Sequence, residues 1–330
     1  MGALSKIAKA ALAGCAAIVA MQPLGAETIP VSGVYAPDVA LPADIELIVI
    51  ERFRGDVGSD VELALTEALG NVIIRGEPWF ELARPRDLRD AVVEVEGNDG
   101  TIHTVPLVAD AELRGTVRSE VIERRVDDKV ERECVARDED GDCIERREVR
   151  IECREISVRI DPRILLIAQN GEQLYSQNRS RTEAERFCLD SYSVPSSLDM
   201  GNALIARLVA DIRGDLAPVQ SRRNIRVMES RSDLNRADRR PFRDAVRATN
   251  ESIEAACSGF EALEATNPAH VSVLFNIGLC YESGGELERA ADYYSRALEV
   301  DPDKDYPRDG MRRIRSREQA EIMLAEREAL

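Results

Sequence analysis

The sequence predicts an α+β protein, with an N-terminal α/β sandwich built on a mixed sheet and an all-α C-terminal region of helical hairpins. Three observations predict this class. Apolar runs typical of strands alternate with an amphipathic helix at the start, and several strand-like segments follow. A polar, arginine-rich stretch then interrupts the chain, and beyond residue 240 the apolar spacing is that of paired helices. At 330 residues, the chain has room for about two domains.

In the N-terminal region, Ile45–Ile50 is an apolar run typical of a buried strand. Ser59 and Glu62 have the spacing of a capping box, so they predict the start of a helix. Its apolar face is expected to comprise Val61, Leu65 and Leu69, and Gly70 is the expected C-cap.

Further strands are expected after this helix. Trp79–Leu82 predicts a second strand, closed by Pro85. Ser196 or Ser197 is expected to cap a last helix. The expected order of elements is thus a strand, a helix and a strand, followed by several strands and a final helix. The later strand-like segments are Leu113–Val126, Val149–Ile160, Ile164–Ile167 and Leu174-Tyr175, and the last helix has an apolar face of Leu204, Ile205, Leu208, Val209 and Ile212.

The net charge excludes one class of partner. Lys and Arg number 44 against 61 Asp and Glu, which gives −17, whereas a nucleic-acid-binding protein needs positive charge for the phosphates. Aromatic residues make up only 4%, so platforms for stacking bases are scarce. Nucleic acid is therefore not an expected partner.

Residues 1–26 have the pattern of a secretory signal peptide. Lys6 and Lys9 precede an apolar run over Ala10–Met21, and Pro23 and small residues follow. The run is about 12 residues, shorter than the roughly 20 of a membrane-spanning helix. We expect cleavage before Glu27 and a soluble periplasmic protein.

An outer-membrane lipoprotein is the alternative. Leu12–Cys15 resembles a bacterial lipobox, in which Cys15 would be lipidated. However, Lys9 lies close to Cys15, and apolar residues rather than a polar tether follow the cysteine. Membrane association is therefore expected only if Cys15 is lipidated.

Six of the seven cysteines follow residue 26, and an even number in an exported chain indicates disulfides. Cys134–Cys143 is predicted because the two residues flank Asp140-Gly141, a hairpin-turn pair. Cys257–Cys280 is predicted because the two residues fall at similar heights on antiparallel helices. Six cysteines allow fifteen connectivities, so the sequence alone does not determine the pairing. Cys153–Cys188 is predicted only by elimination, as the pair that remains.

No metal, cofactor or catalytic site is expected. The cysteine spacings match no usual zinc pattern, and the acidic turn Asp138, Asp140 and Asp142 lacks the Gly and Glu positions of a calcium loop. His103 and His270 are interpreted as structural. Because no nucleophile elbow, phosphate loop or dinucleotide fingerprint is present, the chain is predicted not to be an enzyme. The alternative is a carboxylate-dependent envelope hydrolase.

The segments Ile45–Phe53, Ser59–Leu69, Trp79–Arg84 and Ala109–Gly115 together resemble the CsgG-like family over about 150 residues. This family includes curli secretion channels and penicillin-binding-protein activator lipoproteins, and the resemblance implies an envelope protein with the α/β sandwich fold. The hairpin 126–150 departs from the channels, because it carries charge on both faces whereas a lipid-facing strand is apolar at every second position. We therefore expect a soluble, disulfide-closed hairpin, either a solvated flap or an electrostatic docking arm, and not a pore.

The C-terminal region carries the most specific motif. Residues at the signature spacings of the 34-residue tetratricopeptide repeat (TPR) indicate a helical hairpin. Gly278 and Ala290 are small where its helices approach, Tyr281 and Tyr294 are expected between neighbouring hairpins, and Pro302 ends the second helix. The signature residues are Leu274, Ile277, Gly278, Tyr281, Gly285, Ala290, Tyr294, Ala297 and Pro302.

These patterns predict a domain organisation. Residues 27–218 form the α/β domain, 219–240 a charged linker or short charged helix, and 241–330 the TPR-like domain. Upstream of the intact repeat, the sequence keeps the second helix of another repeat but little of its first. The segment Asp309–Ala329 is expected to be a polar helix that caps the array.

Short TPR arrays bind peptides or helices on a concave face, which the repeat register places at Ser272, Phe275, Leu279 and Glu282. The sequence thus favours a non-enzymatic periplasmic scaffold that binds protein partners in envelope or secretion assembly. The alternative function is that of a tethered lipoprotein regulating cell-wall synthesis. A repeat module that only packs against the first domain is the structural alternative.

Overall fold

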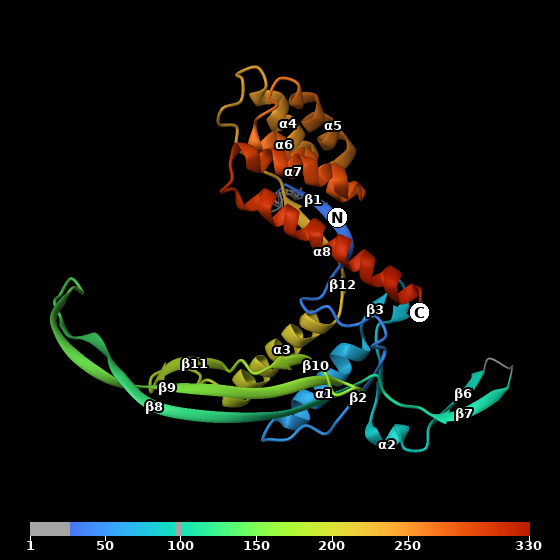
Figure 1. Ribbon diagram of the computed structural model, residues 1–330. Coiled ribbons are helices and arrows are strands. Elements are labelled where there is room, and N and C mark those ends of the chain that lie inside the picture. The colour runs from blue at the N-terminus through green and yellow to red at the C-terminus, as the bar shows by residue number, and fades with distance from the viewer. Residues whose placement is uncertain (1–26, 97–100) are drawn as a thin grey trace, which may run out of the picture. The chain divides into compact units, whose positions relative to one another are not determined.

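The computed structural model describes residues 27–96 and 101–330 and divides the chain into two compact units (Figure 1). The α/β unit comprises Val31–Arg223 and Asp305–Leu330, and the helical unit comprises the residues up to Pro30 and Asn224–Lys304. The predicted signal peptide and Cys15 lie outside the described residues.

The α/β unit is built on one mixed sheet. Its strand order is β10-β9-β8-β2-β5, and β11 also pairs with β9. β2 is parallel to both its neighbours, whereas β9 is antiparallel to β8, β10 and β11. The elements of this unit before residue 224 are β2 (Leu47–Ile50), α1 (Gly58–Gly70), β3 (Ile73–Ile74), β4 (Glu77–Pro78), β5 (Glu81–Ala83), α2 (Pro85–Leu88), β6 (Val92–Glu96), β7 (Ile102–Pro106), β8 (Ala111–Arg137), β9 (Cys143–Ala168), β10 (Gln173–Gln177), β11 (Arg181–Cys188) and α3 (Ser197–Leu216).

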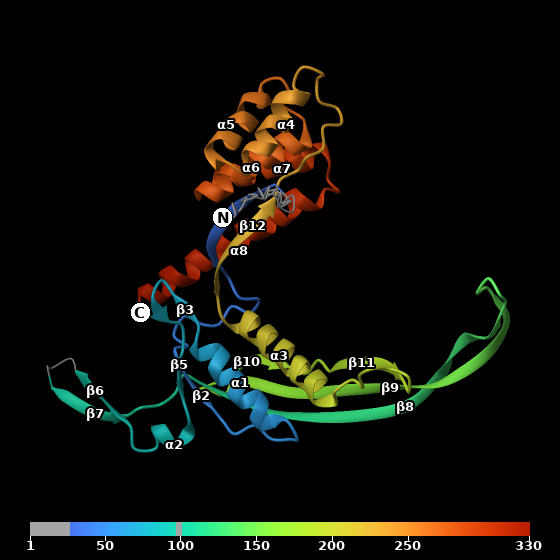
Figure 2. The same cartoon turned by 180° about the vertical axis from the view of Figure 1, so that it is seen from behind.

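Helices α1 and α3 cover one face of this sheet, and none of the helices in the described part of the chain covers the other face (Figures 1 and 2). The apolar spacing of both helices explains the arrangement, because every residue predicted for the two apolar faces is buried. Ser196 caps α3, since its hydroxyl oxygen accepts the N–H of Asp199 at 3.2 Å.

The ends of α1 differ from the prediction. Its N-cap is Val57, and no side chain caps the helix. Glu62 does not close a capping box with Ser59, because its carboxylate accepts the N–H of Phe53 at 2.9 Å. At the other end Gly70 lies within the helix, and Asn71 is the C-cap.

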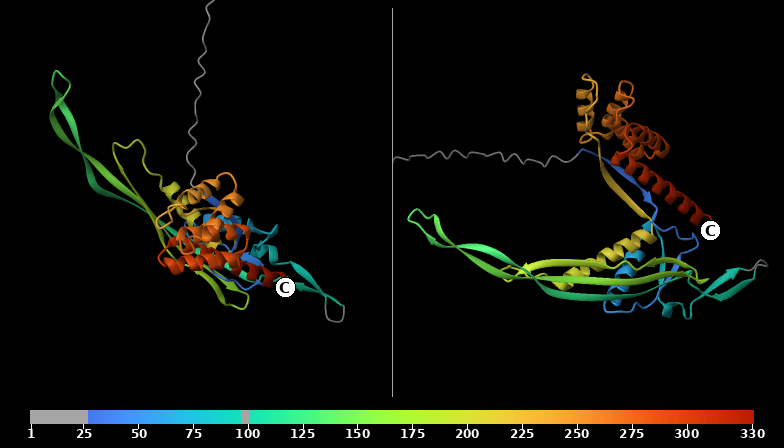
Figure 3. Two further views of the ribbon diagram at one scale, coloured as in Figure 1. Left: turned by 90° about the horizontal axis from the view of Figure 1, so that it is seen from above. Right: turned by 60° about the vertical axis from the view of Figure 1, so that its left-hand side comes forward.

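Strands β8 and β9 are far longer than predicted, at 27 and 26 residues. The two strands remain paired beyond the expected strand ends, and the register shifts at Val126–Lys129 and at Cys134–Arg137. Their outer part, residues 123–156, is here called the arm. It projects beyond the end of α3 (Figure 3). The predicted hairpin 126–150 is thus the end of the main sheet rather than a separate flap.

A two-stranded ribbon corrects the predicted linker. β1 (Thr28–Tyr35) pairs with β12 (Val219–Arg226), so the first part of residues 219–240 is a strand. The sequence reading missed β1, although Ile29 and Val31 alternate with less buried residues as a strand requires.

The helical unit contains two hairpins. They are formed by α4 (Arg239–Ala248) with α5 (Ile253–Glu264) and by α6 (Val271–Gly284) with α7 (Leu287–Val300). The upstream hairpin therefore has both helices, and the prediction of a largely lost first helix is wrong. Phe242 and Phe260 pack together at a centroid distance of 5.9 Å, and Ala245 faces Gly259, so other residues replace the missing signature positions.

The C-terminal helix α8 (Asp305–Glu328) belongs to the α/β unit and is not a cap of the repeats. Leu324 joins the core of that unit, and the Arg327 guanidinium lies over the Trp79 ring at 4.3 Å and pairs with Glu46 at 3.1 Å. The predicted boundary of 241–330 is corrected accordingly. Within the two described ranges, no helix has the length and apolar character needed to cross a membrane.

Candidate protein-binding site

The α6–α7 hairpin is packed as its signature residues predict. A Cβ on Gly278 would lie 2.8 Å from the Tyr294 ring, so only glycine permits this approach of the two helices. Gly285 ends α6 with φ +84°, a conformation that favours glycine. Ala290 and Ala297 are fully buried, and Pro302 follows the end of α7.

The two signature tyrosines have different positions. Tyr281 reaches the upstream hairpin, because its hydroxyl donates to Glu261 of α5 at 2.7 Å. This hydrogen bond, together with burial, raises the pKa of Tyr281 to about 12. Tyr294 instead fills the interior of its own hairpin. It stacks on Phe275 at 5.5 Å and donates to Glu282 at 2.6 Å, which corrects the expectation that it lies between hairpins.

The predicted partner-binding face is not a free surface. Ser272 is 1% exposed, and Phe275, Leu279 and Glu282 are 0% exposed. These four side chains therefore cannot contact a partner in this conformation, and their assignment as an open binding face is corrected.

Part of the chain itself lies along α6. The side-chain amide of Asn276 accepts the N–H of Met228 at 2.8 Å and donates to the carbonyl of Met228 at 2.9 Å. The Ser283 hydroxyl donates to the Pro30 carbonyl at 2.6 Å, and the N–H of Val227 donates to the Glu27 carbonyl at 3.0 Å. Residues 227–230 are here called the groove segment. The segment uses backbone atoms to bind α6, as an extended peptide ligand would.

Asn276 is the functional residue that the sequence reading missed. It is fully buried, and a buried amide must satisfy its hydrogen bonds. The available signal was a polar residue inside the apolar stretch Leu274–Leu279, which required a partner outside the helix.

Cys257 of α5 and Cys280 of α6 join the two hairpins by the disulfide that the sequence predicts, with Cα atoms 5.7 Å apart. His270 precedes α6, and its Nε2 lies 2.6 Å from the Ser232 carbonyl oxygen, a structural position. His103 lies in the exposed strand β7, with its Nε2 2.7 Å from the Thr101 hydroxyl.

The arm is the second candidate interaction surface. Its charges pair with one another across the two strands, so acids and bases on the arm neutralise each other. The pairing is incomplete, because the exposed side chains of Arg146 and Arg150 on the arm have no acidic partner in the described ranges. The pairs are Arg124–Glu155 at 2.7 Å, Arg154–Glu123 at 2.9 Å, and Arg132–Glu148 and Arg147–Glu133 at 3.5 Å.

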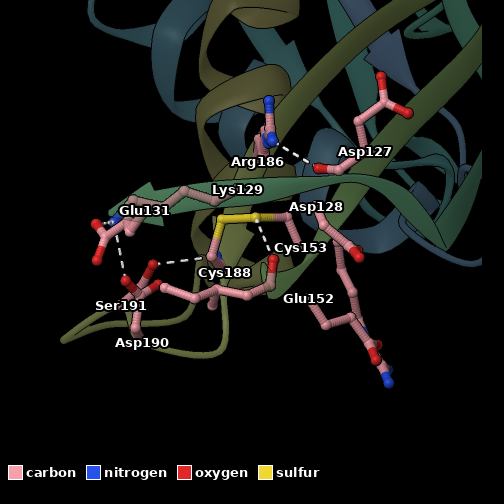
Figure 4. Close-up of a disulfide and its surroundings, with 12 residues drawn as sticks. Asp127, Asp128, Lys129, Glu131, Glu152, Cys153, Arg186, Cys188, Asp190 and Ser191 are labelled. Atoms are coloured by element: carbon pink, nitrogen blue, oxygen red, sulfur yellow. Dashed lines mark hydrogen bonds and ion pairs between the residues drawn. A yellow bond between two sulfur atoms is a disulfide. The ribbon is translucent and has the colours of Figure 1, made fainter. Parts of the chain in front are cut away.

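Cross-links hold the base of the arm (Figure 4). Cys153 of β9 and Cys188 of β11 lie opposite each other in register and form the disulfide that elimination had suggested. Nearby, Lys129 donates to Asp190 at 2.8 Å. This bond raises the pKa of Lys129 to about 12 and lowers that of Asp190. The loop after β11 is thereby attached to the arm.

The remaining predicted disulfide, Cys134–Cys143, closes the tip of the arm with Cα atoms 5.8 Å apart. Replacing both cysteines by serine is expected to leave the thermal midpoint of the α/β unit unchanged, because the tip makes no contact with the core cluster. Hydrogen exchange should accelerate only near the tip, over residues 130–148. A lower midpoint in calorimetry would contradict this assignment.

One cavity of about 110 Å³ is lined by two carboxylates, Glu62 and Asp87. A hydrolase would need such a pair free to act on a substrate. Here Glu62 accepts the N–H of Phe53, and Asp87 accepts the N–H of Arg84 at 3.0 Å, so both carboxylates hold local backbone structure.

Comparisons with known proteins identify the repeat. Residues 271–304 match the tetratricopeptide repeat family, which supports a TPR module at this place in the chain. No curated protein matches the chain. Among solved structures, it is similar to a putative neuraminyllactose-binding hemagglutinin homolog from Helicobacter pylori, with 11% identity, a TM-score of 0.25, and coverage of 54% of this chain and 86% of that chain. A likeness this weak supports no inference about fold or function.

Proposed function

We propose that this protein is a non-enzymatic scaffold that binds protein partners through its TPR, in cell-envelope or secretion assembly. One observation carries the proposal. The TPR helix α6 holds an extended chain segment through the backbone of Met228, so its surface has the chemistry needed to bind a peptide.

The groove segment has a consequence for binding. Among the described residues, the Asn276 side chain forms hydrogen bonds only with the backbone of Met228, and any extended peptide can offer the same N–H and carbonyl. A partner segment therefore has to displace residues 227–230. Because the groove segment is tethered to the repeat by the chain, its effective concentration is high, and it weakens partner binding until it is released.

Two variants test this mode of binding. Val227 is 1% exposed, so Val227→Asp is expected to expel the groove segment and leave α6 intact. A partner captured by the exported protein and then purified should bind this variant about tenfold more tightly, a gain of about 1.4 kcal/mol. Adding Asn276→Ala should remove the gain. The measurement is isothermal titration calorimetry.

The matched control is Val130→Asp, which places the same charge at a valine on the arm that is 52% exposed. It should leave partner affinity unchanged. Equal affinity of the parent and the Val227→Asp variant would contradict binding in the groove.

Export to the periplasm is part of the proposal. Three disulfides support it, because such bonds persist in oxidising compartments. The intact mass of the exported protein is expected to correspond to a chain beginning at Glu27. A diacylglyceryl group on Cys15 would instead favour the tethered lipoprotein that regulates cell-wall synthesis.

An envelope role is also proposed from the CsgG-like resemblance of the α/β unit. The resembling residues have clear physical roles. The Asp110 carboxylate accepts the N–H groups of Glu46 and Leu47 at 3.0 and 2.7 Å and so fixes the start of β2. A Cβ on Gly115 would lie 2.8 Å from the Phe53 ring.

A further inference from the structure

The helix-free face of the main sheet is hollowed beside the β10–β11 loop. A shallow cavity of about 770 Å³ lies over β9 between β8 and residues 176–180. Its lining contains Arg118 from β8 and Arg159, Asp161 and Arg163 from β9, together with the apolar residues Pro162, Ile164 and Leu165. It belongs entirely to the α/β unit and has no part in the proposed binding of partners by the TPR.

Two of these arginines have no acidic partner. Asp161 is engaged by Arg159 at 2.9 Å and also accepts the Ser180 hydroxyl, and its pKa is lowered by the hydrogen bond from Arg159 and then by that from Ser180. Within residues 27–96 and 101–330, the side chains of Arg118 and Arg163 form neither a hydrogen bond nor an ion pair.

The strand register brings these two arginines together. Arg118 lies opposite Asp161, and Arg163 lies opposite Thr116, so the arginines are diagonal neighbours on one face. Such neighbours are about 7–8 Å apart at the backbone. The guanidinium groups of the two arginines can therefore converge on one small anion. Glu120, an acid on the same face of the sheet, lies opposite Arg159.

Neutral groups surround the two arginines. Thr116, Ser176 and Asn178 line the same cavity, and in the described ranges their side chains form no hydrogen bond. Hydroxyl and amide groups can bind the hydroxyls of a polar ligand, and guanidinium groups bind carboxylate or phosphate with two parallel hydrogen bonds.

We propose that this cavity binds a small, hydroxylated oxyanion, that is, a carboxylate- or phosphate-bearing sugar. Arg118 and Arg163 hold the oxyanion, and Thr116, Ser176 and Asn178 hold the hydroxyl groups. The ligand supplies a negative charge to these two arginines, since the Asp161 carboxylate in the same cavity is engaged by Arg159 and Ser180.

The test is titration calorimetry on the full exported chain with three anionic probes, namely inorganic phosphate, glucuronate and glucose 6-phosphate, and with glucose as the uncharged probe. At least one anion is expected to bind, and glucose is expected to bind at least tenfold more weakly. Binding of glucuronate alone assigns a carboxylate ligand, and binding of the two phosphates alone assigns a phosphate ligand.

The variant Arg118→Gln/Arg163→Gln is expected to weaken anion binding at least tenfold. Its matched control is Arg146→Gln/Arg150→Gln, which removes two exposed arm arginines that also have no acidic partner in the described ranges but lie outside this cavity. Four exposed arginines can be changed without loss of core packing, which thermal unfolding verifies. Failure of all three anions to bind, or an equal loss in the control, would overturn the proposal.

Discussion

Replacing Cys257 and Cys280 together by alanine is expected to destabilise the helical unit by about 3 kcal/mol. The disulfide links α5 to α6 and joins residues 23 apart in sequence. Its loss removes a constraint on the unfolded chain, which raises the conformational entropy of the unfolded state and so lowers the free energy of unfolding. Amide hydrogens of α5 and α6 should then exchange about a hundredfold faster, which hydrogen-exchange mass spectrometry measures.

The double variant Cys134→Ala/Cys143→Ala is the matched control, because it removes a disulfide from the tip of the arm. It should leave exchange in α5 and α6 unchanged. Fluorescence of Trp79, which packs in the α/β core, should report the same unfolding midpoint in both variants. Unaltered exchange after loss of Cys257–Cys280 would mean that the disulfide contributes nothing to the hairpin stack.

Asn276→Ala is expected to lower the free energy of unfolding by about 2–3 kcal/mol. The substitution removes both hydrogen bonds to Met228 and leaves the Met228 N–H and carbonyl without their partner. Asn276→Asp keeps an acceptor for the N–H but loses the donor and buries a charge, so it should be at least as damaging. Urea unfolding followed by far-ultraviolet circular dichroism measures both.

Asn250→Ala is the control for this pair, since Asn250 is an exposed asparagine in the α4–α5 turn of the same unit. It should change stability by less than about 0.5 kcal/mol. If Asn276→Ala changed the free energy of unfolding as little as Asn250→Ala, the hydrogen bonds to Met228 would not hold the groove segment in solution.

Local periodicity predicted much of this fold. The apolar face of α3 over Leu204–Ile212 and the small residues Gly278 and Ala290 identified their elements because each obeys a short-range spacing rule. The three cysteine pairs followed from a turn, a helix register and elimination.

Long-range packing defeated the same reasoning. The polarity of the segment Asp309–Ala329 predicted a cap of the repeats, but Leu324 belongs to the α/β core and the guanidinium of Arg327 lies over the ring of Trp79 in that core. The length of β8 and β9 could not be predicted, because the arm carries charged residues on both faces and lacks the apolar alternation typical of a strand. Cross-strand ion pairs take the place of apolar contacts there.

The candidate site showed the same limit. The repeat register predicted an open binding face on α6, but the four side chains predicted for it are buried. Two of them, Phe275 and Glu282, contact Tyr294 of α7 inside the same hairpin. The contact between Asn276 and Met228 could not be predicted from the register either, because it joins segments more than forty residues apart in the chain.

The central claim is that the groove segment is held on α6 of the TPR through the backbone of Met228, and the amide hydrogen of Met228 tests it most directly. Its exchange can be followed residue by residue by nuclear magnetic resonance on the exported chain. The bond to Asn276 predicts protection comparable with that of the α6 amides, lost in Asn276→Ala. Exchange of the Met228 amide in the parent protein at the rate of an exposed loop would contradict the occupied groove.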